Sequence, residues 1–444
     1  MLHRDHRGLA VSGADAAAIE GYETALRQFQ CYVDDPVATI DGTLERSPAF
    51  VMGHVLRAYL FLLGTEPSGL APARDSYAAA RRHPANEREA GHLDAIGQIL
   101  DGNWVAAGRS LEDVAIAHPR DTLALQAGHI IDFLLGDSRM LRDRIARALP
   151  AWSRDMPGWH AVLGMHAFGL EETGLYDRAE ETGRAAIAIE PRDGWAQHAV
   201  AHVLEMRCRP GDGIAWMRGN EEGWSRDSFF SVHNWWHLAL FHLELGEVDE
   251  ALALYDDPAK IKGGRSGVVL DMIDASAFLW RLHLRGVDVA DRWRPIAEQW
   301  APIARAGNYA FNDAHAVMAF AGAGRHDLVE AVLTAQDDAM RGAGDNARFI
   351  REVGRPVTLG IAAFAAGDHA AALRLLRPVR NGAARFGGSH AQRDLIDLTM
   401  IEAALRDREE ALAAALVAER ASLRPDSPFT RLLQHRASAL PAAA

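Results

Sequence analysis

Four histidines and one glutamate occupy two neighbouring helical segments at spacings that could support chemistry. His198, His202 and Glu205 stand four and three residues apart, and His233 and His237 repeat the four-residue spacing. Residues three and four positions apart lie on the same side of an α-helix, so each set of side chains points in one direction. Two such helices side by side would direct four imidazoles and a carboxylate into one space. These groups supply the chemistry of metal binding and of acid/base catalysis.

A divalent metal is one occupant that this space could take. His198 and His202 with His233 or His237 would provide the three protein ligands of a catalytic zinc site, whose fourth position stays open. Glu205 would then be a fourth ligand, an orienting partner of a ligand, or a general base. Zinc is the first expectation, with iron or manganese next. A metal-free polar pocket is an equal alternative.

Other polar and aromatic residues could complete the pocket. Asp313 and His315 are candidates for a catalytic acid or base. The candidates for holding a substrate are Trp195, Asn234, Trp236, Asn312 and Arg393. Tryptophans at helical spacing usually pack between repeats, and at least one of these could wall the pocket. Arg393 follows a Gly-Gly-Ser turn in which Ser389 should cap a helix, and it could hold a substrate carboxylate or pair with a local acid.

Histidines earlier in the chain have more ordinary interpretations. His129 and Asp132 stand three apart on one predicted helix, which favours a hydrogen-bonded core pair over a catalytic one. His160 and His166 lie on the helix before Gly174 and could border the groove of the fold.

A regular series of turns predicts the elements that position these residues. The turn residues are Gly102, Gly136, Gly174, Cys208 and Gly246, at spacings of 34, 38, 34 and 38 residues. An apolar residue two positions later and an alanine five positions later follow three of the glycines, as at the start of the second helix of a tetratricopeptide repeat. Pro119 and Pro191 each lie 17 residues after a glycine, where proline ends a helix. The sequence therefore predicts an all-α, tetratricopeptide-repeat-like α-solenoid of stacked antiparallel helix pairs that form a superhelix.

The repeat register separates the histidine pairs from chance. A chain of 444 residues with 20 histidines contains roughly one pair four residues apart from composition alone. In the repeat register, His198, His202 and Glu205 fall on positions that line the concave surface of such an array, where ligands bind. We therefore expect a polar pocket, with ordinary packed or solvated histidines as the alternative.

The chain divides into four segments according to how regular the repeat pattern is. The predicted segments are an N-terminal helical segment at 1–90, regular repeats with the histidine-rich groove at 91–256, irregular repeat-like helices at 257–437, and a tail at 438–444. Apolar periodicity predicts helices over 14–34 and 49–63. The run LGTEPSGLAPAR between Leu63 and Arg74 predicts a loop.

Composition excludes several classes of function. The net charge of −13 disfavours a nucleic-acid partner, since phosphate binding needs a basic face. Only two cysteines occur, Cys31 and Cys208, far apart in sequence and in no ligand-like spacing, so neither a disulfide framework nor a cysteine zinc site is available. With no apolar leader and no stretch of 18 apolar residues, no membrane association is expected, and the predicted location is cytoplasmic. Lys260 and Lys262 are the only lysines, and no phosphate-binding loop motif occurs, which disfavours Schiff-base and nucleotide chemistry.

Six ordered motifs carry a resemblance to a known family. They are PAFVMGH, FGLEETGLYDRAE, WAQHAVAHVLEM, HNWWHLALFHLELGE, FNDAHAVMA and GGSHAQRD. In this order they resemble the signatures of the tetratricopeptide repeat protein 38 family, over most of the chain. The resemblance implies the repeat fold and the location of a site. The matching positions are His198, His202 and Glu205, then His233, Asn234 and His237, then Asn312, Asp313 and His315, and finally residues 387–394 with His390 at a variable position.

Three functions remain in competition. The first expectation is a metal-dependent hydrolase acting on a small molecule, with Glu205 or Asp313 moving protons. The second is a non-catalytic scaffold whose groove binds a peptide or protein partner. The third is a metal-free protein that binds a small ligand. A groove of histidines, tryptophans and acids, in place of the exchangeable polar residues of a scaffold, favours the closed pocket.

Overall fold

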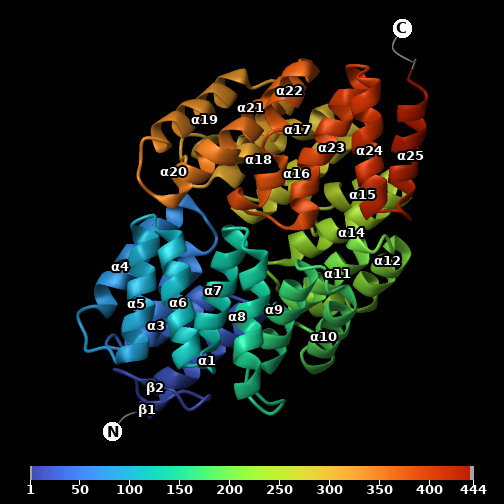
Figure 1. Ribbon diagram of the computed structural model, residues 1–444. Coiled ribbons are helices and arrows are strands. Elements are labelled where there is room, and N and C mark those ends of the chain that lie inside the picture. The colour runs from blue at the N-terminus through green and yellow to red at the C-terminus, as the bar shows by residue number, and fades with distance from the viewer. Residues whose placement is uncertain (1–2, 441–444) are drawn as a thin grey trace. The chain divides into compact units, whose positions relative to one another are not determined.

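The computed structural model describes residues 3–440, and this part of the chain is almost entirely helical (Figure 1). It contains 25 α-helices and one short antiparallel sheet, in which β1 (His3–Arg4) pairs with β2 (Ala10–Val11). Consecutive helices pack against one another in pairs, as in a tetratricopeptide-like helical repeat. The all-α prediction is therefore confirmed. Contacts divide the chain into two compact units, each of which is described by itself.

The first unit consists of the chain up to Val203 together with residues 220–231. Its helices are α1 (Ala16–Cys31), α2 (Pro36–Arg46), α3 (Val51–Leu62), α4 (Leu70–Ala80), α5 (Glu87–Leu100), α6 (Trp104–Ala117), α7 (Thr122–Leu134), α8 (Ser138–Ala148), α9 (Trp159–Glu171), α10 (Tyr176–Ile189), most of α11 (Gly194–Met206), and α13 (Glu221–Ser225). Short 3-10 turns occur at Pro67–Gly69 and Leu149–Ala151. Helices α5 to α10 pack in chain order, which the blue to green ribbons of Figure 1 show.

The second unit consists of residues 204–219 and the chain from Val232 onward. Its helices are the end of α11, α12 (Pro210–Gly219), α14 (Ser231–Leu245) from its second residue, α15 (Val248–Asp256), α16 (Val269–Leu284), α17 (Ala290–Trp300), α18 (Ala310–Gly322), α19 (His326–Ala339), α20 (Asp345–Phe349), α21 (Arg355–Ala365), α22 (His369–Leu376), α23 (His390–Arg406), α24 (Glu410–Leu423) and α25 (Pro428–Ser438). A π-helical turn (Ile350–Gly354) and 3-10 turns (Lys262–Gly264, Ala301–Ile303, Arg380–Phe386) connect them. Helix α16 packs against both α18 and α23, which brings distant parts of the sequence together.

Backbone angles confirm the predicted turns. The angle φ is 80° at Gly102, 68° at Gly136, 76° at Gly174 and 82° at Gly246, and Cys208 reaches 54°. Glycine enters this left-handed region without the steric cost of a Cβ atom, so it suits the end of a helix. The same conformation recurs at Gly286, Gly324, Gly367 and Arg408. The turn pattern therefore continues through the segment predicted to be irregular.

Small residues let the paired helices approach closely. Ala179 on α10 is fully buried and packs with Leu170 and Val203. One turn later, a Cβ atom at Gly183 would lie 2.5 Å from Cγ2 of Val200. Since real Cβ contacts are not that short, this position also requires a small residue.

The predicted loop between Leu63 and Arg74 is wrong in its second half. A 3-10 turn begins at Pro67, and α4 begins at Leu70. Pro67 and Pro72 stand in the first turns of these elements, where a proline without an N–H group is tolerated. The helices predicted over 14–34 and 49–63 are confirmed as α1 and α3.

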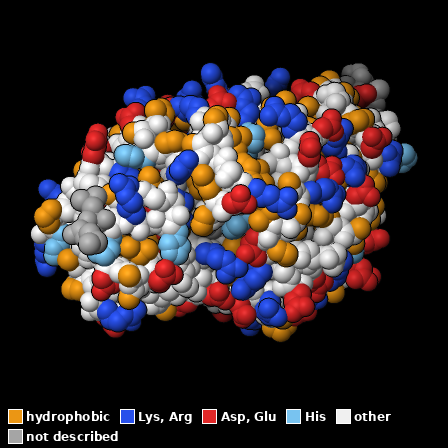
Figure 2. Space-filling model, turned by 90° about the horizontal axis from the view of Figure 1, so that it is seen from below, with side chains coloured by type: hydrophobic (Ala, Val, Ile, Leu, Met, Phe, Trp, Pro, Cys, Tyr) orange, Lys and Arg blue, Asp and Glu red, His pale blue; other side chains and the backbone are white. Residues whose placement is uncertain are grey.

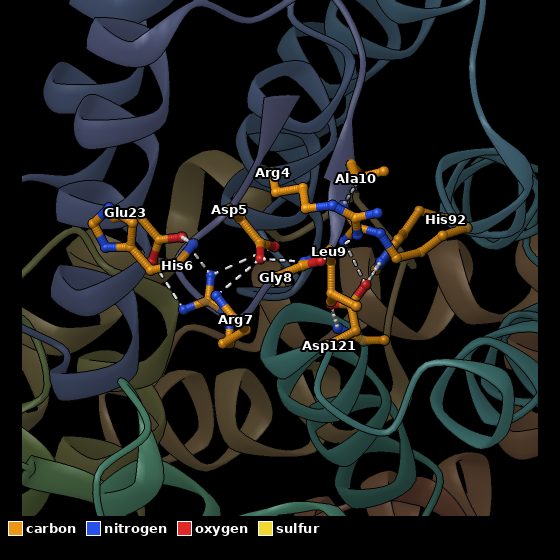
Figure 3. Close-up of polar contacts among 12 residues, drawn as sticks. Arg4, Asp5, His6, Arg7, Gly8, Leu9, Ala10, Glu23, His92 and Asp121 are labelled. Atoms are coloured by element: carbon orange, nitrogen blue, oxygen red, sulfur yellow. Dashed lines mark hydrogen bonds and ion pairs between the residues drawn. The ribbon is translucent and has the colours of Figure 1, made fainter. Parts of the chain in front are cut away.

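A buried ion network fastens the N-terminal hairpin to α1. Two nitrogens of Arg7 donate to Glu23 at 2.8 and 2.7 Å, and Asp5 accepts the N–H groups of Arg7 and Leu9 at 3.0 and 2.9 Å (Figure 3). The side chains of Arg7 and Glu23 are only 3% and 10% exposed. Because water cannot replace these bonds, the hairpin is held to the helix behind it.

For the surface and the ends of the chain, the structure agrees with the predictions from the sequence only in general terms. Every helix within residues 3–440 is too short or too polar to cross a bilayer. Acidic and basic side chains are intermixed on the face drawn in Figure 2. The predicted division at residues 90, 256 and 437 stays a prediction, and residues 441–444 of the predicted tail lie outside the described residues.

Candidate functional site

Helix α11 carries His198 and His202 on one side, as predicted from their spacing. Their ring centroids are 4.4 Å apart, and the rings are almost perpendicular. Both side chains are buried. Phe168 lies 5.1 Å from His198 and 5.4 Å from His202, and Trp195 lies 4.7 Å from His198, between ring centroids. This aromatic packing restricts the orientations of both imidazoles.

Trp195, a predicted substrate-binding residue, lies within an aromatic cluster of the first unit. Its ring stacks on Tyr32 at 5.7 Å and meets the edge of His129 at 5.6 Å. Burial lowers the pKa of His129 to about 3, so its ring is neutral at physiological pH. The predicted pair of His129 and Asp132 is wrong, because Asp132 accepts two hydrogen bonds from Arg144 at 2.7 and 2.9 Å.

Helix α14 carries the second histidine pair. The ring centroids of His233 and His237 are 4.9 Å apart, again with nearly perpendicular rings. Nδ1 of His233 lies 2.9 Å from Oδ2 of Asp274, a fully buried residue of α16. Burial raises the pKa of the Asp274 carboxyl, and the charge of His233 opposes that rise. With Nδ1 held by Asp274, Nε2 is the nitrogen of His233 that would bind a metal.

Glu205 lies close to His237. Oε2 of Glu205 is 3.6 Å from Nδ1 of His237, and Oε1 is 3.6 Å from a guanidinium nitrogen of Arg424. Burial raises the pKa of Glu205, while the charges of Arg424 and Arg281 oppose the rise. Burial also holds the pKa of His237 well below its usual range, with further lowering by His233 and Arg281. His237 is thus a neutral imidazole, which is the form of histidine that binds a metal.

Two predicted substrate-binding residues lie on α14 beside the histidines. The ring of Trp236 lies 5.3 Å from that of His233 and 4.9 Å from that of His237, and Arg281 lies 5.8 Å from its centroid. Asn234 is fully buried on the same helix. The ring of Trp236 therefore packs directly against both imidazoles.

The remaining predicted residues lie on α18 and α23, and Asn312 is buried on α18. Asp313 accepts a hydrogen bond from Nε2 of Gln336 at 3.1 Å, and burial raises its pKa to about 7. Nδ1 of His315 lies 2.8 Å from the carbonyl oxygen of Phe311. Burial lowers the pKa of His315 to about 4.

Arg393 makes a local contact at the start of α23. Its Nη1 donates to the carbonyl oxygen of Gly388. Ser389 caps this helix, as predicted, and forms a capping box with Gln392. The guanidinium of Arg393 is thus engaged by the turn that precedes its own helix.

Two further histidine and aspartate pairs are part of the repeat framework. Nε2 of His92 lies 3.0 Å from Asp121, and Nδ1 of His160 lies 2.7 Å from Asp193. Each aspartate also caps the next helix, by accepting an N–H bond at 3.0 or 2.9 Å. Such a pair is therefore not by itself a sign of a metal ligand. The partner of His233 differs, because Asp274 lies within a helix rather than at its start.

His166, predicted to border the groove, is a buried residue of α9. Burial lowers the pKa of His166 to about 4, with smaller contributions from Arg178 and Arg142. Its imidazole is consequently neutral near pH 7.

The sequence did not predict two features of the second unit. Asp274 could have been suspected, since it and Asp271 are acidic residues in the largely apolar first half of α16. The other is a cavity of about 40 Å³, lined by side chains that include four arginines. Its only signal in the sequence is a four-residue spacing that occurs twice, in Arg281 with Arg285 and in Arg420 with Arg424.

Comparison with known proteins adds the following. No family model matches the chain. A chain in the solved structure titled "Structure of Naa15/Naa10 bound to HypK-THB" is similar at 12% sequence identity and a TM-score of 0.26, over 94% of this chain and 65% of that chain. This chain thus spans about 65% of the length of the chain that it matches. The protein is a tetratricopeptide-like helical-repeat protein with buried histidine and glutamate groups that could hold a metal.

Proposed function

We propose that the protein binds one divalent metal ion, zinc first and iron or manganese next, through three of the four histidines His198, His202, His233 and His237, which leaves one position open. The observation that carries the proposal is the pair on α14, where the neutral ring of His237 stands beside an imidazole that Asp274 holds in place. Zinc sites in proteins use neutral imidazoles whose second nitrogen is held by a carboxylate.

The continuity of α11 supports a single site for both pairs. Glu205 follows His202 by three residues on this helix, so the two side chains share a side. The rise between them is about 4.5 Å along the axis. Since Glu205 is 3.6 Å from His237, we propose that His202 and His237 are directed toward the same ion.

We further propose that the metal serves the hydrolysis of a small molecule. A zinc ion with an open position lowers the pKa of a bound water and polarises a carbonyl group. Glu205 is the carboxylate that would hold a proton beside the ligands. Trp236 would wall the site, and Asp313 and His315 remain proposed as acid or base groups.

The competing proposal is a non-catalytic scaffold that binds a peptide or protein partner, or a metal-free protein that binds a small ligand. The helical-repeat fold alone supports the scaffold proposal, because such arrays present extended binding surfaces.

We likewise propose that the chain belongs to the tetratricopeptide repeat protein 38 family, because the six motifs occur in the family's order. We also propose a reducing, cytoplasmic location, which the two free cysteines support.

Elemental analysis tests the metal proposal. Protein purified without a metal-binding tag should contain about one metal ion per chain. His202→Ala and His237→Ala should each lose the metal while remaining folded by circular dichroism. His54→Ala, at a buried histidine on α3, and His435→Ala, at an exposed one on α25, should both retain it. Metal-free wild-type protein would end the proposal and make the scaffold the first choice.

A chelating ligand tests the open position. Acetohydroxamate should bind the metal-loaded protein in calorimetry, because it displaces a metal-bound water. It should fail to bind the His237→Ala variant. If metal-loaded wild-type protein does not bind it, the metal is structural, and the hydrolase proposal is rejected while metal binding stands.

A further inference from the structure

A cavity in the second unit is lined by an unusual number of arginines. Arg281 and Arg285 come from α16, Arg420 comes from α24, and Arg424 follows directly after α24. Glu205, Glu244 and Asp394 are the acidic residues of the lining. The cavity measures about 40 Å³, which is room for a few water molecules or for one small polar group.

Two of the arginines are already paired with acidic residues. Nη1 of Arg420 donates to Asp394 at 2.6 Å. Nη2 of Arg424 lies 3.6 Å from Glu205 and 3.4 Å from the sulfur of Met206. The charges of these two arginines are thus at least partly compensated within the lining.

The other two arginines contact no carboxylate within the described residues. Arg281 donates to the carbonyl oxygen of Ala391, and Arg285 donates to that of Leu243 at 2.8 Å. The guanidinium of Arg285 also lies 3.5 Å from the ring centroid of Phe429. Carbonyl groups and rings accept hydrogen bonds or stabilise a cation, but they do not neutralise its charge.

The third acid of the lining is occupied elsewhere. Glu244 accepts hydrogen bonds from the hydroxyl of Ser427 and from the backbone N–H of Phe429, the latter at 3.4 Å. Glu244 therefore holds the start of α25. Four guanidinium groups face three carboxylates around the cavity, which leaves one positive charge without a counterion.

Some of the buried nitrogens also lack an acceptor. Among the residues that the structure describes, Nη1 of Arg281 and Nε of Arg420 are buried without a hydrogen-bond partner. Arg281 is 5% exposed and Arg420 is 7% exposed. Burial lowers the pKa of Arg281 and lowers that of Arg285 to about 9, and the charges of the nearby acids Glu205, Glu244 and Asp394 offset the loss of water only in part. Both groups are nevertheless charged at neutral pH.

We infer that this cavity binds a small monoanion of the carboxylate class, held by Arg281 and Arg285. A carboxylate would supply the missing negative charge and the acceptors that the unpaired nitrogens need. The planar guanidinium fork matches the two oxygens of a carboxylate. A dianion such as phosphate at neutral pH would instead leave excess negative charge beside Glu205 and Asp394. The inference needs no metal, although Glu205 also belongs to the proposed metal site.

Calorimetry with the full-length protein tests the inference. Acetate is the probe, and acetamide is its neutral counterpart of nearly the same shape, both at fixed ionic strength. We expect saturable binding of acetate and no binding of acetamide. Arg281→Met and Arg285→Met should each weaken acetate binding at least tenfold. Arg294→Met should not change it, since that side chain is 84% exposed on α17 of the same unit.

A charge-preserving variant distinguishes loss of acetate binding from loss of folding. Arg281→Lys keeps the positive charge and loses the fork, so we expect weakened acetate binding with unchanged circular dichroism. Equal binding of acetate by wild-type and Arg285→Met protein would overturn the assignment. Tighter binding of inorganic phosphate than of acetate would overturn the carboxylate class.

The same titration after removal of metal by a chelator separates the two proposals. Acetate should still bind the chelated protein, because the arginines hold it. Loss of binding on chelation would show that acetate binds a metal and would overturn the arginine site. Absence of metal from the purified protein would reject the metal proposal and leave the acetate result in force.

Discussion

Nδ1 of His233 lies 2.9 Å from Oδ2 of Asp274, and both side chains are buried. The aspartate belongs to α16 and the histidine to α14, so the contact joins helices whose residues are 41 positions apart in sequence. A carboxylate in this position fixes the plane of the imidazole and directs its second nitrogen away from the bond.

The Asp274→Asn variant should bind metal more weakly. An amide holds His233 less firmly than a carboxylate, and loss of such a partner typically reduces metal affinity about 10- to 100-fold. Competition with a fluorescent zinc chelator measures the change. Asp121→Asn is the matched control, because it alters another buried aspartate and histidine pair, formed by the capping residue of α7 and His92 of α5. It should lower stability and leave zinc affinity unchanged. Equal affinity in Asp274→Asn and wild-type protein would exclude this role for Asp274.

The Ala179→Leu variant should be destabilised by about 1 to 3 kcal/mol in urea denaturation, because the added volume has no space in a close helix contact. Ala185 on the same helix is exposed, so Ala185→Leu should change stability by less than about 0.5 kcal/mol. If the two variants are equally stable, the repeat register is wrong at α10.

Asp313 should make stability depend on pH. Its pKa is raised to about 7 from an ordinary value of 3.8, so the folded protein holds this proton more tightly than the unfolded chain does. This contribution is complete below pH 3.8 and is lost as pH rises toward 7. Asp313→Asn cannot ionise, and it should flatten the decline between these values by roughly 2 to 4 kcal/mol. Urea denaturation at pH 5 and pH 8, compared between variant and wild type, measures this. Parallel pH profiles would contradict it.

The Glu23→Gln variant should loosen the N-terminal hairpin. Arg7 would lose a charged partner in a site where water cannot replace it, and Asp5, 3.8 Å away, compensates only in part. We expect a loss of about 1 to 3 kcal/mol and faster cleavage near the N-terminus in limited proteolysis. Glu45→Gln on α2 is the control, since that side chain is exposed. Equal cleavage rates in both variants would count against the anchoring role of Arg7.

Local features of this protein could be predicted from its sequence. The left-handed turn at Gly174 and the helices around it follow from residue types within a few positions. The spacing of such turn residues along the sequence therefore predicted the repeat fold. The approach of His198 to His202 was equally predictable, because one helix contains both.

Contacts between distant helices could not be predicted in this way. Spacing along one helix carries no information about Asp274, whose partner His233 lies on another helix. The arginine cavity combines residues from Glu205 to Phe429, and only tertiary packing brings them together. A buried acid in an apolar helix is a useful signal, but it does not name its partner.

The pairs of His92 with Asp121 and His160 with Asp193 also bear on how a site could arise in such a chain. In each, an aspartate that caps one repeat holds an imidazole of the repeat before it. Duplication of a repeat copies both halves of this arrangement at once. The copied histidine is therefore oriented from the start, and divergence has only to direct its second ring nitrogen toward a new occupant. Duplication of repeats can thereby add imidazoles that are already oriented, while the packing that stabilises them is kept.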